Sequence, residues 1–242
     1  MPDDIHIGTE RTALITGASR GLGLALARGL AARGWNLIIT ARDPVRLRAV
    51  RDELARITHV AALAGDVTDR DHRTELAVLA RGHTGLDALI NNAGILGPSP
   101  QPQLMDYPLA TLVEVYLANV VAPLGMIQDL RAELRPGARI VNLTSDAGVT
   151  PYPGWGGYGS GKAALEQLSA VLAVEEPDLK VYWVDPGDLR TEMHQAAFPG
   201  EDISDRPLPE TVVPGFVRLL EGDLASGRYS AAALASARAE AA

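Results

Sequence analysis

The chain has 242 residues, with 22 basic and 30 acidic side chains and a formal net charge of −8. This length can bury a large core, and α/β chains of this size often fold as one unit, so we expect a single domain over residues 1–242. The acidic balance argues against a nucleic-acid or anionic-membrane surface, and the absence of cysteine excludes disulfides, thiolate nucleophiles and zinc–thiolate sites.

Targeting and metal signals are missing from the sequence. The first four residues are Met-Pro-Asp-Asp, no signal-type apolar core follows them, and no run approaches about 18 apolar residues. The five histidines do not have metal-ligand spacing. We therefore expect a cytoplasmic protein without a metal site, whose partners are small molecules.

Short apolar runs alternate with segments of helical periodicity along the whole chain. This alternation predicts an α/β fold with a doubly wound parallel sheet, Rossmann-like, and helices on both faces. The expected strands are residues 13–15, 36–40, 60–64, 88–91, 139–144, 180–184 and a short one near 228–230.

Two proline-rich stretches, 97–108 and 198–215, follow the ends of predicted strands. Ligands bind at the carboxyl ends of the strands in such sheets, so we expect these stretches to form walls or lids of a substrate cleft. The lid region is predicted at about 192–215, although surface loops without a function have the same composition.

A glycine-rich turn joins the first predicted strand to the first helix. Gly17, Gly21 and Gly23 follow the apolar run 13–15, and helical apolar spacing begins at Leu24. Such glycines let the backbone approach a pyrophosphate, whose charge the helix N-terminus stabilises. The spacing is Gly-x-x-x-Gly-x-Gly and differs from the usual dinucleotide fingerprint, so this turn alone is weak evidence.

Tyr158 and Lys162 are four residues apart and would lie on one face of a helix. An ammonium beside a phenol would lower the pKa of the phenol toward the range of an acid–base catalyst. Only two of the 22 basic residues are Lys, and with six Tyr about 0.05 chance matches to Tyr-x-x-x-Lys are expected. For this pair alone, a solvated Lys beside an aromatic residue remains an open explanation.

Further segments complete a set: Asn91-Asn92-Ala93-Gly94, Asn119, Ser145 and Pro186-Gly187. With the glycine-rich turn and the Tyr–Lys pair, the chain resembles the short-chain dehydrogenase/reductase family of compact single-domain type, from about residue 11 to about 191. The resemblance implies an NAD(P)-binding catalytic domain that transfers a hydride between a nicotinamide cofactor and a carbonyl or alcohol substrate.

The resemblance also implies a role for each of four residues. Tyr158 would be the general acid, and Ser145 would hydrogen-bond the carbonyl oxygen, with Thr144 as the rival for that hydroxyl. Lys162 would orient the nicotinamide ribose and lower the Tyr158 pKa. Asn119 would support a water molecule that relays protons to Lys162.

Cofactor preference is indicated by two cations. Ala41 stands at the end of the second strand, where enzymes that prefer NAD carry an acid, and Arg42 follows it. Arg20 is the other cation that family members use to hold a 2′-phosphate, so we expect NADP(H). Asp43 complicates this prediction, because it could pair with Arg42, and either Arg could be a solvated charge.

The remaining cofactor contacts follow from the resemblance. Asp66 and Val67 would hold the adenine, 92–94 would pack on the adenosine, and the segment from Pro186 to Thr191 would clamp the carboxamide. The full predicted set is Gly17, Ser19, Arg20, Gly21, Leu22, Gly23, Arg42, Asp66, Val67, Asn92, Ala93, Gly94, Tyr158, Lys162, Pro186, Gly187, Leu189 and Thr191.

These residues favour an NADPH-dependent reductase of a ketone or aldehyde. NAD-dependent alcohol oxidation and a non-catalytic nucleotide-sensing protein of the same fold are the alternatives. The presence of Asn119, Ser145, Tyr158 and Lys162 argues against the sensor, because such proteins usually lose one of the four.

Three features depart from the family pattern. Gly161 stands beside Lys162, where Ser or Ala is more common, and two glycines this close weaken the helix start. Asp188 is an unusual acid that would repel an anionic substrate, bind a cationic one or, as we expect, cap the following turn. The ending lacks the Asp-Gly-Gly common in tetrameric members.

We therefore expect a homodimer built on the helices that carry Asn119 and Tyr158. In the family these two helices from each subunit commonly pack into a four-helix interface. The apolar residues that predict it are Leu112, Val113, Leu117, Val121, Leu165, Leu168 and Leu172.

Overall fold

The computed structural model describes residues 11–239, in which seven parallel strands form one sheet of order β3-β2-β1-β4-β5-β6-β7. The order reverses direction between β1 and β4, which is the switch point of a doubly wound sheet. The strands are β1 Thr12–Thr16, β2 Asn36–Ala41, β3 Val60–Ala64, β4 Leu86–Asn91, β5 Leu134–Leu143, β6 Lys180–Asp185 and β7 Gly227–Ser230.

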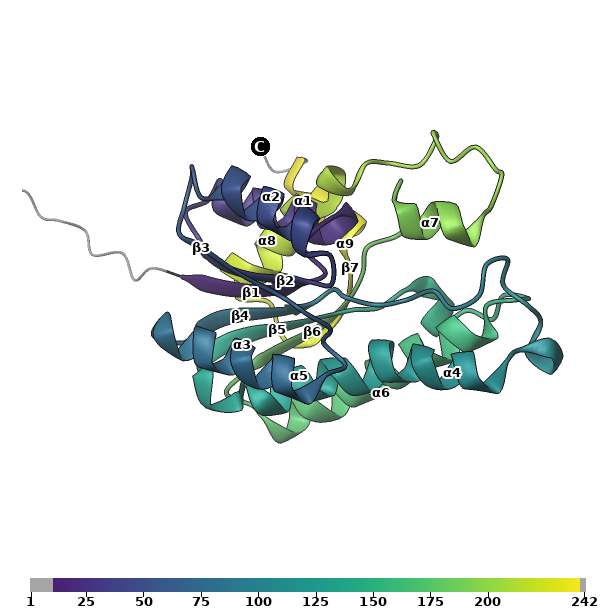
Figure 1. The fold of residues 1–242 in the computed structure, drawn as a ribbon, viewed down its shortest axis with the longest axis horizontal. Coiled ribbons are helices and arrows are strands. Elements are labelled where there is room, and N and C mark those ends of the chain that lie inside the picture. The colour runs from purple at the N-terminus through teal and green to yellow at the C-terminus, as the bar shows by residue number, and fades with distance from the viewer. Residues whose placement is uncertain (1–10, 240–242) are drawn as a thin grey trace, which may run out of the picture.

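Helices cover both faces of the sheet (Figure 1). On one face lie α1 Gly21–Ala31, α2 Pro44–Leu54, α8 Val213–Glu221 and α9 Ala231–Ala239. On the other lie α3 Arg70–Gly82, α4 Leu109–Tyr116, α5 Ala122–Asp129 and α6 Gly156–Glu175. The short helix α7 Glu192–Ala197 stands beyond the end of the strands, in the predicted lid region.

The strands are apolar on both sides because helices bury both sides. In β1, Leu14 packs into one core with Leu76 of α3, whereas Ala13 and Ile15 pack into the other with Leu26 of α1. This alternation of direction along an unbroken apolar run is typical of parallel sheets. The predicted fold class is confirmed.

The seven predicted strands match the observed ones closely, and β5 differs most. It begins at Leu134 instead of 139, because Leu134 pairs with Leu86 before the register shifts and regular pairing resumes at Arg139 with Ala88. Gly137, with φ of +76°, lies in this irregular segment. The sequence Arg-Pro-Gly has turn character, which hid the extension.

The segment Leu109–Asp129 is a nearly continuous helix of α4, a π-helical turn η2 at Leu117–Val121, and α5. Among the described residues it is the one helix long and apolar enough to span a membrane by length and composition, but 44% of its most apolar window is buried inside the protein. Other apolar side chains of this helix are exposed, among them Leu109, Val113, Leu117 and Val121. The π-turn carries Asn119, one of the predicted site residues.

Candidate active site

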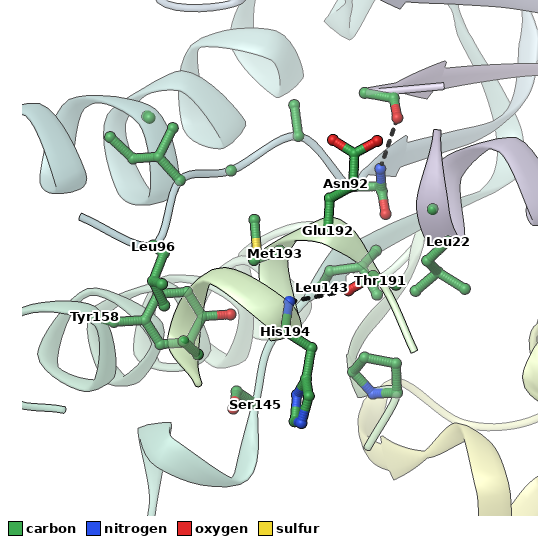
Figure 2. Close-up of a pocket in the computed structure, with 18 of the residues that line it drawn as sticks. Leu22, Asn92, Leu96, Leu143, Ser145, Tyr158, Thr191, Glu192, Met193 and His194 are labelled. Atoms are coloured by element: carbon green, nitrogen blue, oxygen red, sulfur yellow. Dashed lines mark hydrogen bonds between the residues drawn. The ribbon is translucent and has the colours of Figure 1, made fainter. Parts of the chain in front are cut away.

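A cleft of about 910 Å³ opens at the carboxyl ends of the strands. Every predicted site residue except Gly23 and Asn119 lines it. Figure 2 shows Tyr158 and Ser145 on one side of this pocket, with Asn92 and Leu22 across from them. The structure therefore brings together side chains that are spread over more than 170 residues of sequence, from Gly17 to Thr191.

The glycine-rich turn is shaped by close packing. Gly17 and Gly21 have φ of +69° and +54°, which disfavour other residues. A Cβ at Gly23 would lie 2.3 Å from the Gly17 carbonyl oxygen and 2.6 Å from Asn92 Nδ2. Gly23 thus lies behind the turn and lets it fold back on α1, which explains why it does not line the cleft.

Asn92 ties the turn to the end of β4. Its Nδ2 donates to the carbonyl oxygens of Thr16 at 2.9 Å and Gly17 at 3.3 Å. Thr16 Oγ1 in turn accepts from the backbone N–H groups of Asn92 and Ala93, both at 3.0 Å. The N-cap of α1, Arg20, makes no side-chain capping bond, so the first N–H groups of this helix remain available to an anion.

Basic side chains gather at the end of the cleft beside α2, and Glu192 of α7 bridges two of them. Arg20 donates to Glu192 Oε2, and Arg46 of α2 donates to Glu192 Oε1 at 3.0 Å. Arg42 lines the same end. The sequence interpretation did not name Arg46, which only its spacing from Arg42 could have indicated, and it placed Glu192 in the lid region without a role of its own.

Asp43 does not pair with Arg42 among the residues that the structure describes. Its Oδ1 accepts from the N–H groups of Val45 and Arg46 at 3.0 Å each and caps α2, and its Oδ2 lies 3.4 Å from Arg46 Nε. The Asp43 carboxylate is thus engaged by α2 and Arg46. The possible complication raised by Asp43 therefore does not affect Arg42.

Asp66 is fixed at the end of β3. Burial would raise the pKa of this carboxyl, but hydrogen bonds from Thr68 N and Thr68 Oγ1, and the charge of Arg42, lower the pKa overall. Both bonds reach Oδ1, at 2.9 and 2.8 Å. The ionised carboxylate therefore has its second oxygen left to accept a donor from a ligand.

Tyr158 and Lys162 lie one turn apart on α6, as predicted, and both side chains are buried. Lys162 Nζ donates to the Leu143 carbonyl oxygen at 2.7 Å and lies 5.4 Å from the centre of the Tyr158 ring. Burial lowers the pKa of Lys162 to about 8.

The predicted lowering of the Tyr158 pKa is not found. Burial raises this pKa, and the nearby carboxylates of Asp185 and Asp146 raise it further. Lys162 does not offset these effects because its ammonium is bound to a backbone carbonyl and is itself destabilised by burial. Tyr158 is accordingly protonated at neutral pH, the form that can donate a proton.

Asn119 does not line the cleft. Its Oδ1 accepts from Ile95 N and its Nδ2 donates to Ile95 O, both at 2.8 Å. A Cβ at Gly94 would lie 2.9 Å from the same Oδ1. Asn119 therefore fastens the π-turn to the segment after β4, directly beside Lys162.

The structure distinguishes between the two hydroxyls that follow β5. Thr144 is buried, and its Oγ1 donates to Glu166 Oε1 at 2.7 Å. Ser145 is half-buried at the cleft, where its Oγ donates to Asp146 Oδ1 at 3.0 Å. Thr144 also lines the cleft, but its hydroxyl is engaged by Glu166, so the geometry favours Ser145 as the hydroxyl that a substrate can reach.

Aromatic side chains form the wall beside Tyr158. The Trp155 ring lies 5.8 Å from the ring of Tyr158 and 6.0 Å from that of Phe198, between centroids. Tyr152, Met193 and His194 continue this wall. From the predicted lid, residues of α7 and Phe198 line the cleft.

The stretch 97–108 was expected to be a wall, but none of its described residues lines the cleft. It packs behind the segment that does: a Cβ at Gly156 would lie 2.4 Å from Leu104, and one at Gly157 would lie 2.2 Å from the Tyr107 ring. The stretch supports the backbone that precedes Tyr158.

We expected Asp188 to cap the following turn, but among the described residues its carboxylate accepts no hydrogen bond from that turn. Thr191 caps α7 instead, because its Oγ1 accepts from His194 N at 3.1 Å. The Asp188 carboxylate lies 3.8 Å from His194 Nδ1 at the lining of the cleft. Asp146 and His194 are two further lining residues that the sequence interpretation did not single out.

The family model described as short chain dehydrogenase matches residues 11–202. This chain belongs to that family. It is 37% identical to Serine 3-dehydrogenase of Agrobacterium fabrum over 186 residues, which is 75% of this chain and 73% of the relative. It is 32% identical to Sulfoacetaldehyde reductase of Chromohalobacter salexigens over 224 residues, which is 91% of this chain and 87% of the relative.

The fold is also similar to solved members of the short-chain dehydrogenases. A short chain dehydrogenase of Shigella flexneri 2a, solved in complex with NADP, superposes with a TM-score of 0.85 at 28% identity, covering 91% of this chain and 96% of that one. Membership of the family establishes an oxidoreductase fold that binds a nicotinamide cofactor and acts on a small molecule.

Proposed function

We propose that the chain is an NADPH-dependent oxidoreductase that reduces a ketone or aldehyde to an alcohol, with Tyr158 as the general acid. The observation that carries the proposal is the cleft itself, which has Ser145, Tyr158 and Lys162 at one end and Arg20, Arg42 and Arg46 at the other. The names of the two relatives cover an alcohol dehydrogenation and an aldehyde reduction.

The residues present fit the cofactor. The uncapped N-terminus of α1 and the close backbone approach at Gly17 suit a pyrophosphate, and the three arginines suit a 2′-phosphate. Asp66, Val67 and 92–94 would hold the adenosine, and Pro186, Gly187, Leu189 and Thr191 the carboxamide. Bound NADPH supplies the hydride that adds to the carbonyl carbon and is left as NADP⁺.

The chain's own residues then complete the reaction. Ser145 donates a hydrogen bond to the carbonyl oxygen, which requires its hydroxyl to turn away from Asp146. Tyr158 donates the proton that converts the developing alkoxide to the alcohol. Lys162 binds the nicotinamide ribose and takes part in the relay of protons. Asn119 fixes the π-helical turn that lies beside Lys162.

A panel of ketones and aldehydes, assayed by oxidation of NADPH, tests the function. We expect turnover of at least one carbonyl compound by the parent protein and its loss in Tyr158→Phe. Binding of NADPH without turnover of any compound would favour the nucleotide-sensing alternative. Turnover of alcohols with NAD alone would favour the NAD-dependent dehydrogenase.

A homodimer on α4, η2 and α6 is part of the proposal. Exposed apolar side chains on these neighbouring helices support it: Leu109, Val113, Leu117, Val121, Leu168, Val171 and Val174. Leu165 is buried and Leu172 packs against the core, so these two residues, which the sequence analysis assigned to the dimer interface, are not part of it. Light scattering at micromolar concentration tests the dimer, and a mass near 25.6 kDa would contradict it.

A further inference from the structure

The charges that line the cleft are unevenly distributed. Among the described lining residues, the arginines all lie at the adenosine end, and Lys162, bound to Leu143, is the one cation at the catalytic end. Asp146, Asp185 and Asp188 line that end. Their charges reach the tyrosines, since Asp185 and Asp146 raise the pKa of Tyr158 and both Asp146 and Asp188 contribute to raising that of Tyr152.

Two of these three carboxylates are engaged within the protein. Asp146 accepts from Ser145 Oγ, Ala147 N and Tyr152 Oη. Asp185 accepts from Gly187 N and lies 3.5 Å from an Arg228 nitrogen. Among the described residues, the one basic side chain within 4 Å of the Asp188 carboxylate is His194, whose Nδ1 lies at 3.8 Å, beyond hydrogen-bond distance.

His194 supplies a second, independent sign of a ligand. Its side chain is 9% exposed, yet its Nε2 is buried without a hydrogen-bond partner. His194 lines the same cleft as Ser145, and Figure 2 labels both among the pocket residues. An unpartnered ring nitrogen in a residue that lines the cleft is a polar group that a ligand can satisfy.

The aromatic wall completes the subsite. The Phe198 ring lies 4.9 Å from the His194 ring and 6.0 Å from the Trp155 ring, between centroids. Aromatic faces stabilise a nearby cation and hold an apolar carbon skeleton. A ligand that is cationic, donates hydrogen bonds and carries an apolar body matches these groups.

We propose that the substrates of this site are amino carbonyl compounds and the corresponding amino alcohols. The ammonium group binds the Asp188 carboxylate, which lies beside His194, while the carbonyl or hydroxyl group faces Ser145 and Tyr158. This inference rests on the proposed function. A positive charge on the substrate also offsets the negative field that raises the Tyr158 pKa, whereas a carboxylate or sulfonate in the same place would be repelled.

Three alcohols of nearly equal shape test the proposal: 2-amino-1-phenylethanol, 1-phenyl-1-propanol and 3-hydroxy-3-phenylpropanoate. Their dissociation constants for the full chain saturated with NADP⁺ are measured by calorimetry, and formation of NADPH is then followed. We expect the ammonium alcohol to bind about tenfold more tightly than the neutral one and the carboxylate to bind most weakly.

Asp188→Asn should lower the ratio of ammonium to neutral affinity about three- to fivefold, the effect of one partly exposed ion pair. His194→Phe, which keeps an aromatic ring and removes the ring nitrogens, should lower it as well. Glu175→Gln, an exposed residue thirteen positions beyond Lys162 on the same helix, removes the same charge and should leave the ratio unchanged.

The outcomes separate the two proposals. Equal binding of the three alcohols, no binding of any, or a ratio insensitive to Asp188→Asn overturns the amino-alcohol site. Oxidation of the neutral alcohol in that case leaves the oxidoreductase function standing. Tight, Asp188-dependent binding of the ammonium alcohol without turnover of any alcohol or ketone would support the amino-alcohol site and overturn the proposed oxidoreductase function.

Discussion

Removing the Glu192 carboxylate should tighten NADPH binding. Glu192 accepts from both Arg20 and Arg46, which we propose hold the 2′-phosphate, so the phosphate must displace it. The three side chains are 57%, 55% and 52% exposed, and ion pairs this exposed contribute about 0.2–1 kcal/mol each. Two such pairs amount to about 0.4–2 kcal/mol, or about 2- to 30-fold in the dissociation constant.

Fluorescence titration of the parent and Glu192→Gln with NADPH and with NADH measures this effect. NADH lacks the phosphate, so the ratio of the NADH to the NADPH dissociation constant should rise by that factor. Glu201→Gln removes the same charge from the same lid region, outside the cleft lining, and should leave the ratio unchanged. An unchanged or smaller ratio in Glu192→Gln would refute the competition between carboxylate and phosphate.

Three further predictions concern catalysis and stability. Tyr158→Phe should keep cofactor affinity and lower turnover by about two orders of magnitude or more, as measured by NADPH oxidation. The pKa of Lys162 falls from 10.5 to about 8 on folding, so the unfolded chain binds more protons between these values. The parent should therefore gain up to about 3 kcal/mol of unfolding free energy relative to Lys162→Met as pH rises from 8 to 10.5, as measured by denaturant titration. Gly23→Ala should cost about 1–3 kcal/mol, because its Cβ would lie 2.3 Å from Gly17 O, whereas Gly161→Ala, with no added contact under 3.7 Å, should stabilise α6 by up to about 1 kcal/mol in thermal melts.

Each of these predictions has an outcome that contradicts it. Turnover by Tyr158→Phe of a carbonyl compound that the parent reduces would exclude Tyr158 as the acid. A constant stability difference between the parent and Lys162→Met across this pH range would mean that the ammonium is solvated. Equal melting temperatures for Gly23→Ala and Gly161→Ala would show that the glycine-rich turn can relax.

Local patterns were sufficient to predict most of the fold and the residues that line the cleft. The apolar runs of β1 to β7, the glycines of the turn and the spacing of Tyr158 and Lys162 each depend on neighbours in sequence. Parallel strands end at one edge of a sheet, so their carboxyl-terminal residues meet there even when the loops are unknown.

Other properties depend on contacts across the fold, which no local pattern contains. The Tyr158 pKa is raised by burial and by the carboxylate of Asp185, which is 27 positions away in the sequence. Glu192 meets Arg20 and Arg46 across 172 and 146 positions. Leu165 and Leu168 have the same residue type on one helix, yet only the first faces the interior.

The π-turn at Leu117–Val121 sets the rotational phase of the helix that contains it. An α-helix turns about 100° per residue, so the extra residue of the turn rotates α5 relative to α4 by about that angle. With it, Asn119 reaches Ile95 while Met126 and Ile127 still face the core. Deleting one residue here would make the helix regular, but it would turn either Asn119 away from Ile95 or Met126 and Ile127 away from the core. The length of this segment is therefore fixed by contacts on both of its sides.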